Sequence, residues 1–319
     1  MKKFHFITSL RYVDFIGFQK FQARLMPGID IIINHKVKQR KWLALDNLEL
    51  AAGLIEYEFL ESAEHLVVGS LTEETLGDVS SNQALIIWLS WLEYLLTDSW
   101  LIKDNAMTCD AAYCRMETTD GHQEWSSNSL ASSCSLSSGE QYKPVSFNRT
   151  DLKDWNKNSY QLRSYLHEKS SNITRDFIGK GFSRLGRALK FVHTAKLEAH
   201  PALKVVHYCS ALESLFGTDT SELSHKLSER VAHFLGANDF SATTVFRDVK
   251  RLYGVRSKVA HGSHLKYDLN KLSEDSVSCD NYVRSIINLI LQKPQFLTML
   301  ESSNEEINLY FEKLIFKSP

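Results

Sequence analysis

Helical periodicity is the feature that most constrains the fold of this chain. From Gly181 to Leu291, apolar residues recur three and four positions apart, and glycine or proline separates the segments. Residues at this spacing share one face of a helix, so each segment buries one face and leaves the other in water. The apolar faces consist of Val205, Cys209, Leu212 and Phe216; Leu223, Leu227, Val231 and Phe234; Val245, Val249 and Leu252; and Cys279, Val283, Ile286 and Ile290. This pattern predicts an all-α bundle.

The bundle is expected to contain a series of short helices. They are predicted at Phe182–Leu197, Pro201–Phe216, Glu222–Leu235, after Ser241 and at about Cys279–Leu291. Proline is favourable as the first residue of a helix, and glycine is favourable just after its end. Pro201 is therefore expected to begin the second helix and Gly217 to end it. A last amphipathic segment, Glu305–Phe316, is expected to dock on the bundle or to contact a partner.

The first 150 residues have a mixed pattern. Strands are predicted at Gly28–Ile33, at Leu54–Phe59, where apolar and acidic residues alternate, and at Leu66–Val68. A tryptophan-rich helix is expected at Ala84–Ile102. Residues 106–125 are expected to form a hairpin that turns at Asp120–Gly121, and the serine-rich stretch Ser126–Ser138 an exposed loop.

These patterns together predict an α+β protein with two domains. Residues 1–150 form an N-terminal mixed α/β domain, residues 151–180 a connecting helix and linker, and residues 181–319 the helical bundle with its C-terminal amphipathic helix. A chain of 319 residues with 43% hydrophobic content is long enough to bury two cores.

Charge and cysteine content narrow the possible functions. The chain carries 37 Lys and Arg against 38 Asp and Glu, a formal net charge of −1, so any nucleic-acid site must be local. Five cysteines, an odd number, do not indicate a disulfide framework and favour a reducing compartment. The N-terminal residues 1–6 lack the apolar run of a signal peptide, so a cytoplasmic protein is expected.

Neither a membrane span nor a metal centre is expected. The run Ala84–Ile102 is long enough to cross a bilayer, but Glu93 and Asp98 lie inside it, and charged side chains are costly in lipid. A buried core helix and no membrane contact are therefore predicted. Four possible ligands in one region lack the spacing of structural zinc sites, so no metal and no cofactor is predicted: Cys109, Cys114, His122 and Cys134.

Arg256 and His261 are the residues that point to chemistry. Arg256 continues the inward series of its helix, which places a guanidinium on an apolar face, where a charge is expensive unless it is paired. Glu213, at the edge of another apolar face, is the expected intramolecular partner. His261 lies five residues on, about 140° around an ideal helix. Either the helix ends between the two residues, or a second copy of the chain completes the site.

A local basic patch surrounds these residues. Thr243–Gly262 contains a single acidic residue, Asp248, and several cations. The cations beside Arg256 are predicted to bind RNA through its phosphates: Arg247, Lys250, Arg251 and Lys258.

The motif Arg256-x-x-x-x-His261 resembles that of the HEPN superfamily and looks most like its ApeA-like branch. The resemblance extends to Ala211–Phe216, which contains Glu213, to Ser228–Ala232 and to the lead-in Tyr253–Arg256. It covers about Phe182 to Leu291 and does not extend to residues 1–150.

The resemblance implies a specific activity. In that family the bundle dimerises so that two such motifs face each other, and catalytic members are metal-independent endoribonucleases. Arg256 and His261 match the motif, Ser257 matches the polar residue that commonly follows the arginine, and Glu213 corresponds to an acidic position on the second helix. The 2′-hydroxyl of RNA would attack the adjacent phosphate, with His261 as base or acid and Arg256 on the phosphate oxygens.

We therefore expect a cytoplasmic homodimer that cleaves RNA. By family analogy it would be a bacterial antiviral-defence or stress effector. The N-terminal domain is expected to act as sensor, regulator or substrate selector through a partner or ligand of its own. Two alternatives stay open. In one, the bundle is a non-catalytic module for dimerisation or for nucleotide or RNA binding, and Arg256 and His261 line an anion pocket. In the other, the motif is structural: Arg256 pairs with Glu213, and His261 caps the helix.

Overall fold

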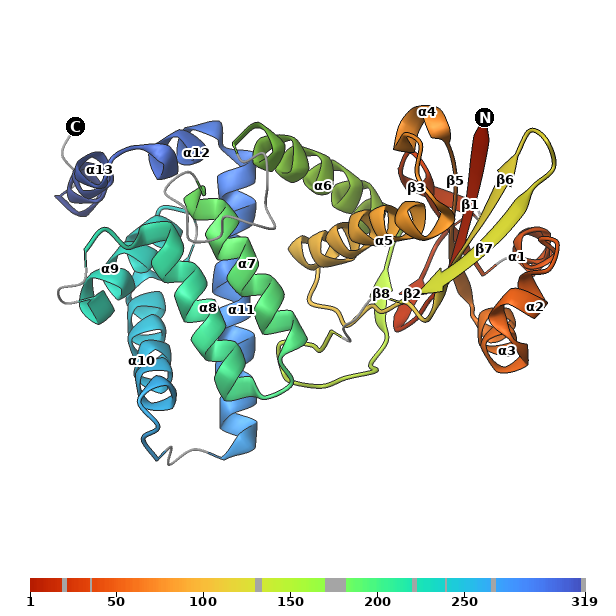
Figure 1. Cartoon of the computed structure of the whole chain (residues 1–319). Coiled ribbons are helices and arrows are strands. Elements are labelled where there is room, and N and C mark those ends of the chain that lie inside the picture. The colour runs from red at the N-terminus through yellow and green to blue at the C-terminus, as the bar shows by residue number, and fades with distance from the viewer. Residues whose placement is uncertain are drawn as a thin grey trace. The chain divides into compact units, whose positions relative to one another are not determined.

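The computed structural model describes residues 1–18, 22–34, 36–129, 134–169, 182–219, 223–238, 240–264 and 268–316 (Figure 1). The chain forms two compact units, Met1–Cys134 with Tyr142–Ser159, and Ser135–Gln141 with Tyr160–Pro319. The first contains an antiparallel sheet and the second is helical, which confirms the α+β class. Helix α6, Arg149–Lys169, is divided between the two units, and most of the linker predicted after it lies outside the described residues.

A six-stranded antiparallel sheet is the framework of the first unit. Its strand order is β3-β4-β5-β1-β6-β7, so β1 is central and β3 is an edge strand. A short parallel pair, β2 with β8, lies outside this sheet. The strands are β1 Lys2–Leu10, β2 Val13–Phe15, β3 Gln22–Met26, β4 Ile29–Ile33, β5 His65–Thr72, β6 Ala112–Thr118, β7 Gln123–Asn128 and β8 Val145–Phe147.

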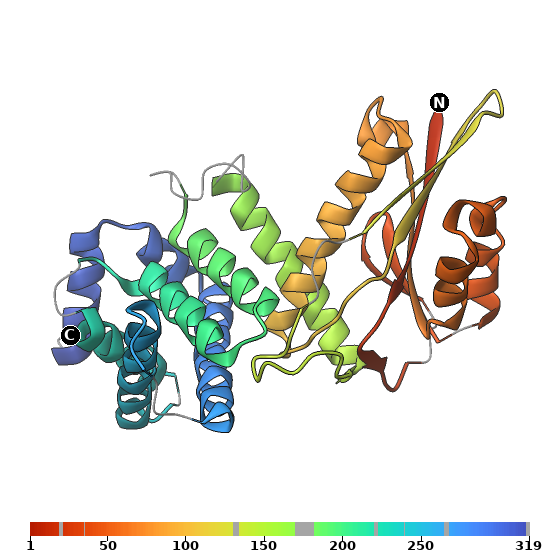
Figure 2. The ribbon, with the colours of Figure 1, turned by 60° about the horizontal axis from the view of Figure 1, so that its bottom comes forward.

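Alternation along the strands gives the sheet two apolar faces. In β1, Phe4 and Phe6 belong to one core and Ile7 to the other, as the two-residue period of a strand requires. Helix α5, Ser81–Asp98, covers the first face, and three short helices cover the second (Figures 1 and 2). These are α1 Lys36–Leu43, α2 Leu48–Ala52 and α3 Leu54–Ser62; the short elements α4 Glu73–Leu76 and η1 Ser99–Leu101 flank α5.

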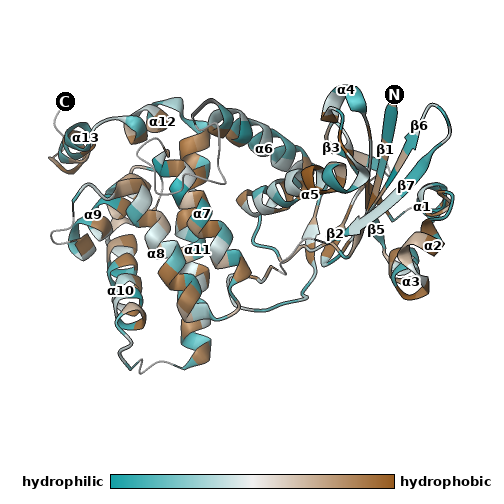
Figure 3. Ribbon diagram, viewed as in Figure 1, coloured by the Kyte–Doolittle hydropathy of each residue, from teal (hydrophilic) through white to brown (hydrophobic). Residues whose placement is uncertain are grey.

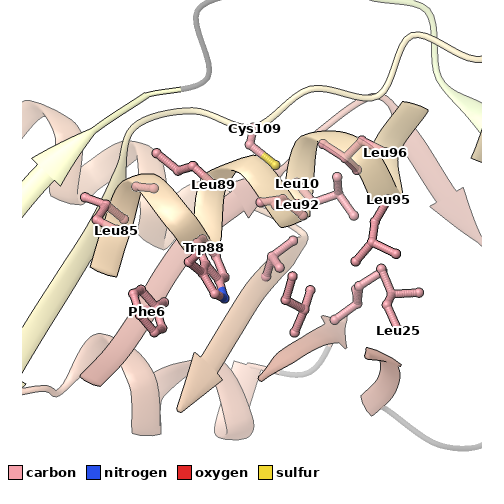
Figure 4. Close-up of a cluster of buried hydrophobic side chains, with 14 of the residues drawn as sticks. Phe6, Leu10, Leu25, Leu85, Trp88, Leu89, Leu92, Leu95, Leu96 and Cys109 are labelled. Carbon is pink, nitrogen blue, oxygen red and sulfur yellow. The ribbon is translucent and has the colours of Figure 1, made fainter. Parts of the chain in front are cut away.

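The tryptophan-rich helix is buried, as predicted. Trp88 of α5 stacks on Phe6 with ring centroids 5.1 Å apart, and its Nε1 donates to the carbonyl oxygen of Gly28 at 2.8 Å (Figure 4). A Cβ at Gly69 would lie 1.9 Å from that same oxygen, so only glycine fits there. Trp155 extends this core from α6, because its Nε1 donates to the carbonyl oxygen of Leu95 at 2.8 Å. This bond fixes the first half of α6 in the first unit.

The strand predicted at Leu54–Phe59 is wrong, because these residues form α3. Gly53, at φ 82°, precedes the helix, and the residues that pack beneath it are Tyr57 and Leu60, three positions apart. Leu54, Ile55 and Phe59 are exposed, so the alternation in the sequence does not reflect burial. The strands at Ile29–Ile33 and His65–Thr72 and the hairpin β6–β7 confirm their predictions.

The second unit is built around helix α8, which packs against α7, α9, α10 and α11. The apolar faces of these helices are visible in Figure 3. The helices are α7 Arg184–Leu197, α8 Pro201–Phe216, α9 Leu223–Gly236, α10 Ala242–Ala260, α11 Leu269–Gln292, α12 Pro294–Glu301 and α13 Asn304–Phe316.

Helix α11 begins at Leu269, well before the predicted Cys279, and before that residue Leu272 is its single buried apolar side chain. The side chain of Asp268 caps the helix by accepting from the backbone N–H of Lys271 at 2.7 Å. Asp275 and Ser276 are fully buried at positions where an apolar residue would have signalled a helix. Helix α12, which begins at Pro294, was not expected either.

Part of the serine-rich stretch belongs to the helical unit. Ser126–Asn128 lie in strand β7, residues 130–133 lie outside the described chain, and Ser135, Leu136 and Ser137 are buried. The N–H of Ser135 donates to the carbonyl oxygen of Lys196 at 2.8 Å, and its Oγ to that of Glu198 at 2.6 Å. The predicted exposed loop is therefore wrong for these residues, because the N–H and the hydroxyl of Ser135 tie this segment to the end of α7.

Candidate functional site

The guanidinium of Arg256, on α10, is held by groups from two helices. Its Nη2 lies 3.2 Å from Oε1 of Glu213, on α8, and donates to Oε2 at 3.4 Å. Its central carbon lies 5.3 Å from the ring centroid of Tyr253, one turn earlier in α10. The predicted pairing of Arg256 with Glu213 is therefore present, and the ring adds a cation–π contact.

Arg256 lies at the edge of the buried face of α10 rather than within it. The inward series is Val245, Val249, Leu252 and Val255, all buried, whereas the side chain of Arg256 is 26% exposed. A repeat of 3.6 residues from Leu252 falls between positions 255 and 256, and the valine takes the deeper one. The expected cost of a fully buried charge therefore does not arise, and part of the guanidinium faces solvent.

Tyr253 is a residue of this cluster to which the sequence assigned no role. Burial and the negative charge of Glu213 raise the pKa of Tyr253 to about 12. The phenol thus stays protonated at neutral pH and can donate a hydrogen bond. Its position three residues before Arg256, on the same face of a helix, is the signal that could have identified it.

The Arg256–Glu213 pair is not fully satisfied. Among the described residues, Nε of Arg256 and Oε1 of Glu213 are buried and have no hydrogen-bond partner. A buried polar atom that makes no hydrogen bond is unusual in a folded protein and calls for an explanation, such as strain, a catalytic role, or a bound water or ion. Rearrangement of this pair would make guanidinium donors available to a phosphate.

His261 is placed by the way α10 ends. The helix stops at Ala260, and Gly262 follows His261 with φ +64°. The N–H of Ser263 donates to the carbonyl oxygen of Lys258 at 2.8 Å, and that of Gly262 to Val259 at 3.1 Å. These two bonds form a Schellman motif. The predicted alternative in which the helix ends between Arg256 and His261 is confirmed.

His261 and Arg256 do not meet within one chain. His261 is exposed, and no hydrogen bond or ion pair joins it to Arg256 or Glu213 in the part of the chain that the structure describes. Ser257 is half-buried, and its carbonyl oxygen accepts from the N–H of His261 at 3.1 Å. A single chain therefore brings together Glu213, Tyr253 and Arg256, and presents His261 separately at the helix end.

The four predicted RNA-binding cations differ in environment. Arg247, Lys250 and Lys258 are exposed on α10, and Lys250 lies 5.7 Å from the ring of Phe246. Arg251 instead forms an ion pair with the fully buried Asp275 of α11 and a second one with Asp248 at 3.4 Å. Its charge is thus largely balanced within the bundle.

The cysteines considered as zinc ligands do not gather into a centre. No group of three or more His, Cys, Asp or Glu suited to a metal occurs among the residues described. Burial raises the pKa of the thiols of Cys109 and Cys114, so both remain protonated. Within the same residues, no helix has both the length and the apolar character needed to cross a membrane.

Comparisons of the chain with models of known protein families, with curated proteins and with solved structures give no match. The family resemblance drawn from the motif therefore stays a prediction.

Proposed function

We propose that this protein is a metal-independent endoribonuclease whose site forms when two copies of the chain bring their α10 ends together. The observation that carries the proposal is the partly exposed guanidinium of Arg256, which Glu213 and Tyr253 hold and whose Nε makes no hydrogen bond with the described residues. His261, fixed in position by a Schellman motif on the same helix, supplies the titratable group.

RNA cleavage by its own 2′-hydroxyl needs a base, an acid and a cation at the phosphate, and these residues provide all three. His261 of one copy removes the proton of a 2′-hydroxyl, whose oxygen forms a bond to the adjacent phosphorus while the bond to the 5′-oxygen breaks. His261 of the other copy gives a proton to that leaving oxygen. Arg256 stabilises the charge on the phosphorane, and Ser257 lies beside it as a further hydroxyl near the phosphate. The products are a 2′,3′-cyclic phosphate and a 5′-hydroxyl.

The exposed cations of α10 extend this site along the RNA. Arg247, Lys250 and Lys258 bind neighbouring phosphates, and their contribution falls as salt rises because bound counterions are released. Arg251 contributes less in this proposal, since Asp275 already pairs with it. The proposed setting, by family analogy, is the bacterial cytoplasm, where the protein acts as an antiviral-defence or stress effector.

One observation favours a second candidate, a non-catalytic module that dimerises or binds nucleotides or RNA. Arg256 is already ion-paired with Glu213, and His261 stands apart from both. A motif in this state can hold the helix bundle together without any reaction. The two candidates differ in whether a phosphodiester bond is broken.

The test is incubation of the purified full-length protein with tRNA or mRNA in excess chelator, followed by analysis of the product ends. Protein carrying both Arg256→Ala and His261→Ala, purified in parallel, is the blank for contaminating nuclease. We expect cleavage with 2′,3′-cyclic phosphate ends, and none of the matching DNA. Loss of cleavage in chelator, or 3′-hydroxyl products, would exclude the proposed chemistry. Binding without cleavage would support the second candidate.

A further inference from the structure

The first unit contains a hollow of about 440 Å³ between the edge strand β3 and the first half of α6. Its volume falls in the range of small-molecule sites. The lining combines four cations, Arg24, Arg149, Lys153 and Lys157, with the apolar side chains of Phe18 and Leu152. All of these residues belong to the first unit.

The described residues of the lining carry positive charge and include no carboxylate. Arg149, Lys153 and Lys157 are exposed and follow one another at four-residue spacing, so they lie along one face of α6. None of the three forms an ion pair with another described residue. Arg24 is paired with Asp30 at 3.1 Å, and its side chain is still 68% exposed.

This arrangement opposes the stability of α6, because like charges four residues apart on a helix repel each other. The net charge of the whole chain is −1, so the cluster does not reflect a generally basic protein. An anion in the hollow would relieve the repulsion and would be attracted by several cations at once.

An amide and an apolar surface complete the hollow. Nδ2 of Asn156 donates to the carbonyl oxygens of Arg24 at 2.9 Å and Leu25 at 3.0 Å, which fixes the amide against strand β3. Its Oδ1 accepts no hydrogen bond from the described chain, so it remains an acceptor in a fixed place. Phe18 and Leu152 are only partly buried and offer apolar contact to a flat ring.

We propose that this hollow binds a nucleotide. The phosphates lie against Arg149, Lys153 and Lys157, the base packs on Phe18 and Leu152, and Oδ1 of Asn156 accepts from an N–H of the base. A fully polar anion would leave the apolar side chains unused, and an uncharged ring would leave the cations without a partner. The inference concerns a different unit from Arg256 and His261 and does not rest on the proposed nuclease activity.

The test is calorimetric titration of the full-length protein with each of the four ribonucleoside triphosphates, with inorganic phosphate and with a nucleoside as separate probes. We expect at least one nucleotide to bind with a Kd below about 100 μM and about tenfold more tightly than either fragment. The double substitution Lys153→Ala, Lys157→Ala should weaken binding about tenfold or more. The matched control is Arg40→Ala, Lys41→Ala, which removes the same charge from α1 and should leave the Kd unchanged.

Several results would overturn this assignment. They are the absence of nucleotide binding, equal binding of inorganic phosphate and nucleotide, and equal loss in the two double variants. Binding of a single-stranded oligoribonucleotide in place of the nucleotides would identify the hollow as an RNA-docking surface instead. Circular dichroism of each variant confirms that α6 is retained, and Asn156→Asp, which adds a negative charge at the fixed amide, should also weaken binding.

Discussion

At the scale of residues, Arg256 forms an ion pair with Glu213 and also contacts the ring of Tyr253. Glu213 is 20% exposed and Arg256 26% exposed, so water screens their attraction only in part. Removal of Arg256 alone would leave the carboxylate of Glu213 half-buried without its main counter-charge. Removing one partner alone should therefore lower the free energy of unfolding by more than replacing both partners together.

A double-mutant cycle tests this coupling. Arg256→Ala, Glu213→Gln and the combined variant should show a coupling energy of about 0.5–1 kcal/mol, the upper part of the range for partly exposed pairs. The measurement is the free energy of unfolding in urea. Single effects that simply add would show that the pair contributes nothing to stability.

His193 of α7 is expected to make the stability of the protein depend on pH. Burial and the nearby positive charges of Lys190, Lys196 and Arg163 lower the pKa of His193 to about 4. In the unfolded chain its pKa is about 6.5, so below that pH the unfolded state binds a proton that the folded state does not. Stability should therefore fall as the pH decreases from 7 to 5.

His193→Gln isolates this contribution. The variant should lose less stability than the wild type over the same pH interval, measured as the shift of the urea midpoint. Titration of the carboxylates affects the stability of both proteins equally, so the difference between them reports His193. An identical pH dependence in the two proteins would show that His193 titrates alike in the folded and unfolded states.

At the scale of elements, the end of α10 depends on Gly262. This residue adopts φ +64°, and a Cβ there would meet no atom within 4 Å, so the cost of a side chain is conformational alone. Gly254, inside the same helix, also has open space around it but no positive φ. The two glycines thus form a matched pair.

Alanine at the two positions should act in opposite directions. Gly262→Ala should destabilise the protein by about 1 kcal/mol and displace His261, whereas Gly254→Ala should stabilise it by about 0.5–1 kcal/mol. Thermal unfolding of both variants gives the comparison. Stabilisation by Gly262→Ala would contradict the Schellman ending of α10.

The same scale shows what the sequence could and could not predict. The bounds of α8 were predictable because Pro201 starts the helix, Gly217 follows it and apolar residues line its buried face. The early turns of α11 were not, because Asp275 is buried through an ion pair with Arg251, a contact between residues far apart in sequence. Helix α3 was misread because five alternating residues fit a strand, while its packing depends on Tyr57 and Leu60.

The sequence predicted which residues form the candidate site better than it predicted how they are arranged. The helical repeat pointed to Arg256 and to Glu213 as its partner, and the ion pair is present. The repeat could not decide between positions 255 and 256 for the deepest side chain, since both lie close to the buried face. The sequence shows the four-residue spacing of Arg149, Lys153 and Lys157 but not the hollow, because Arg24 and Lys153 come together only through the fold.

At the scale of the whole molecule, the proposed reaction needs two chains. One chain presents a single His261, and a base and an acid are both required. Analytical ultracentrifugation of the full-length protein at micromolar concentration should therefore show a dimer. A monomer that nevertheless cleaves RNA would contradict the composite site.

The central claim is that Arg256 and His261 cleave RNA, and the most direct measurement is the single-turnover rate on a labelled RNA in excess chelator. Arg256→Ala and His261→Ala should each lower the rate by about 10²–10³-fold. His264→Ala, which removes an exposed histidine three residues beyond His261, should cleave at the wild-type rate. Wild-type rates in the Arg256→Ala or His261→Ala protein would contradict the account.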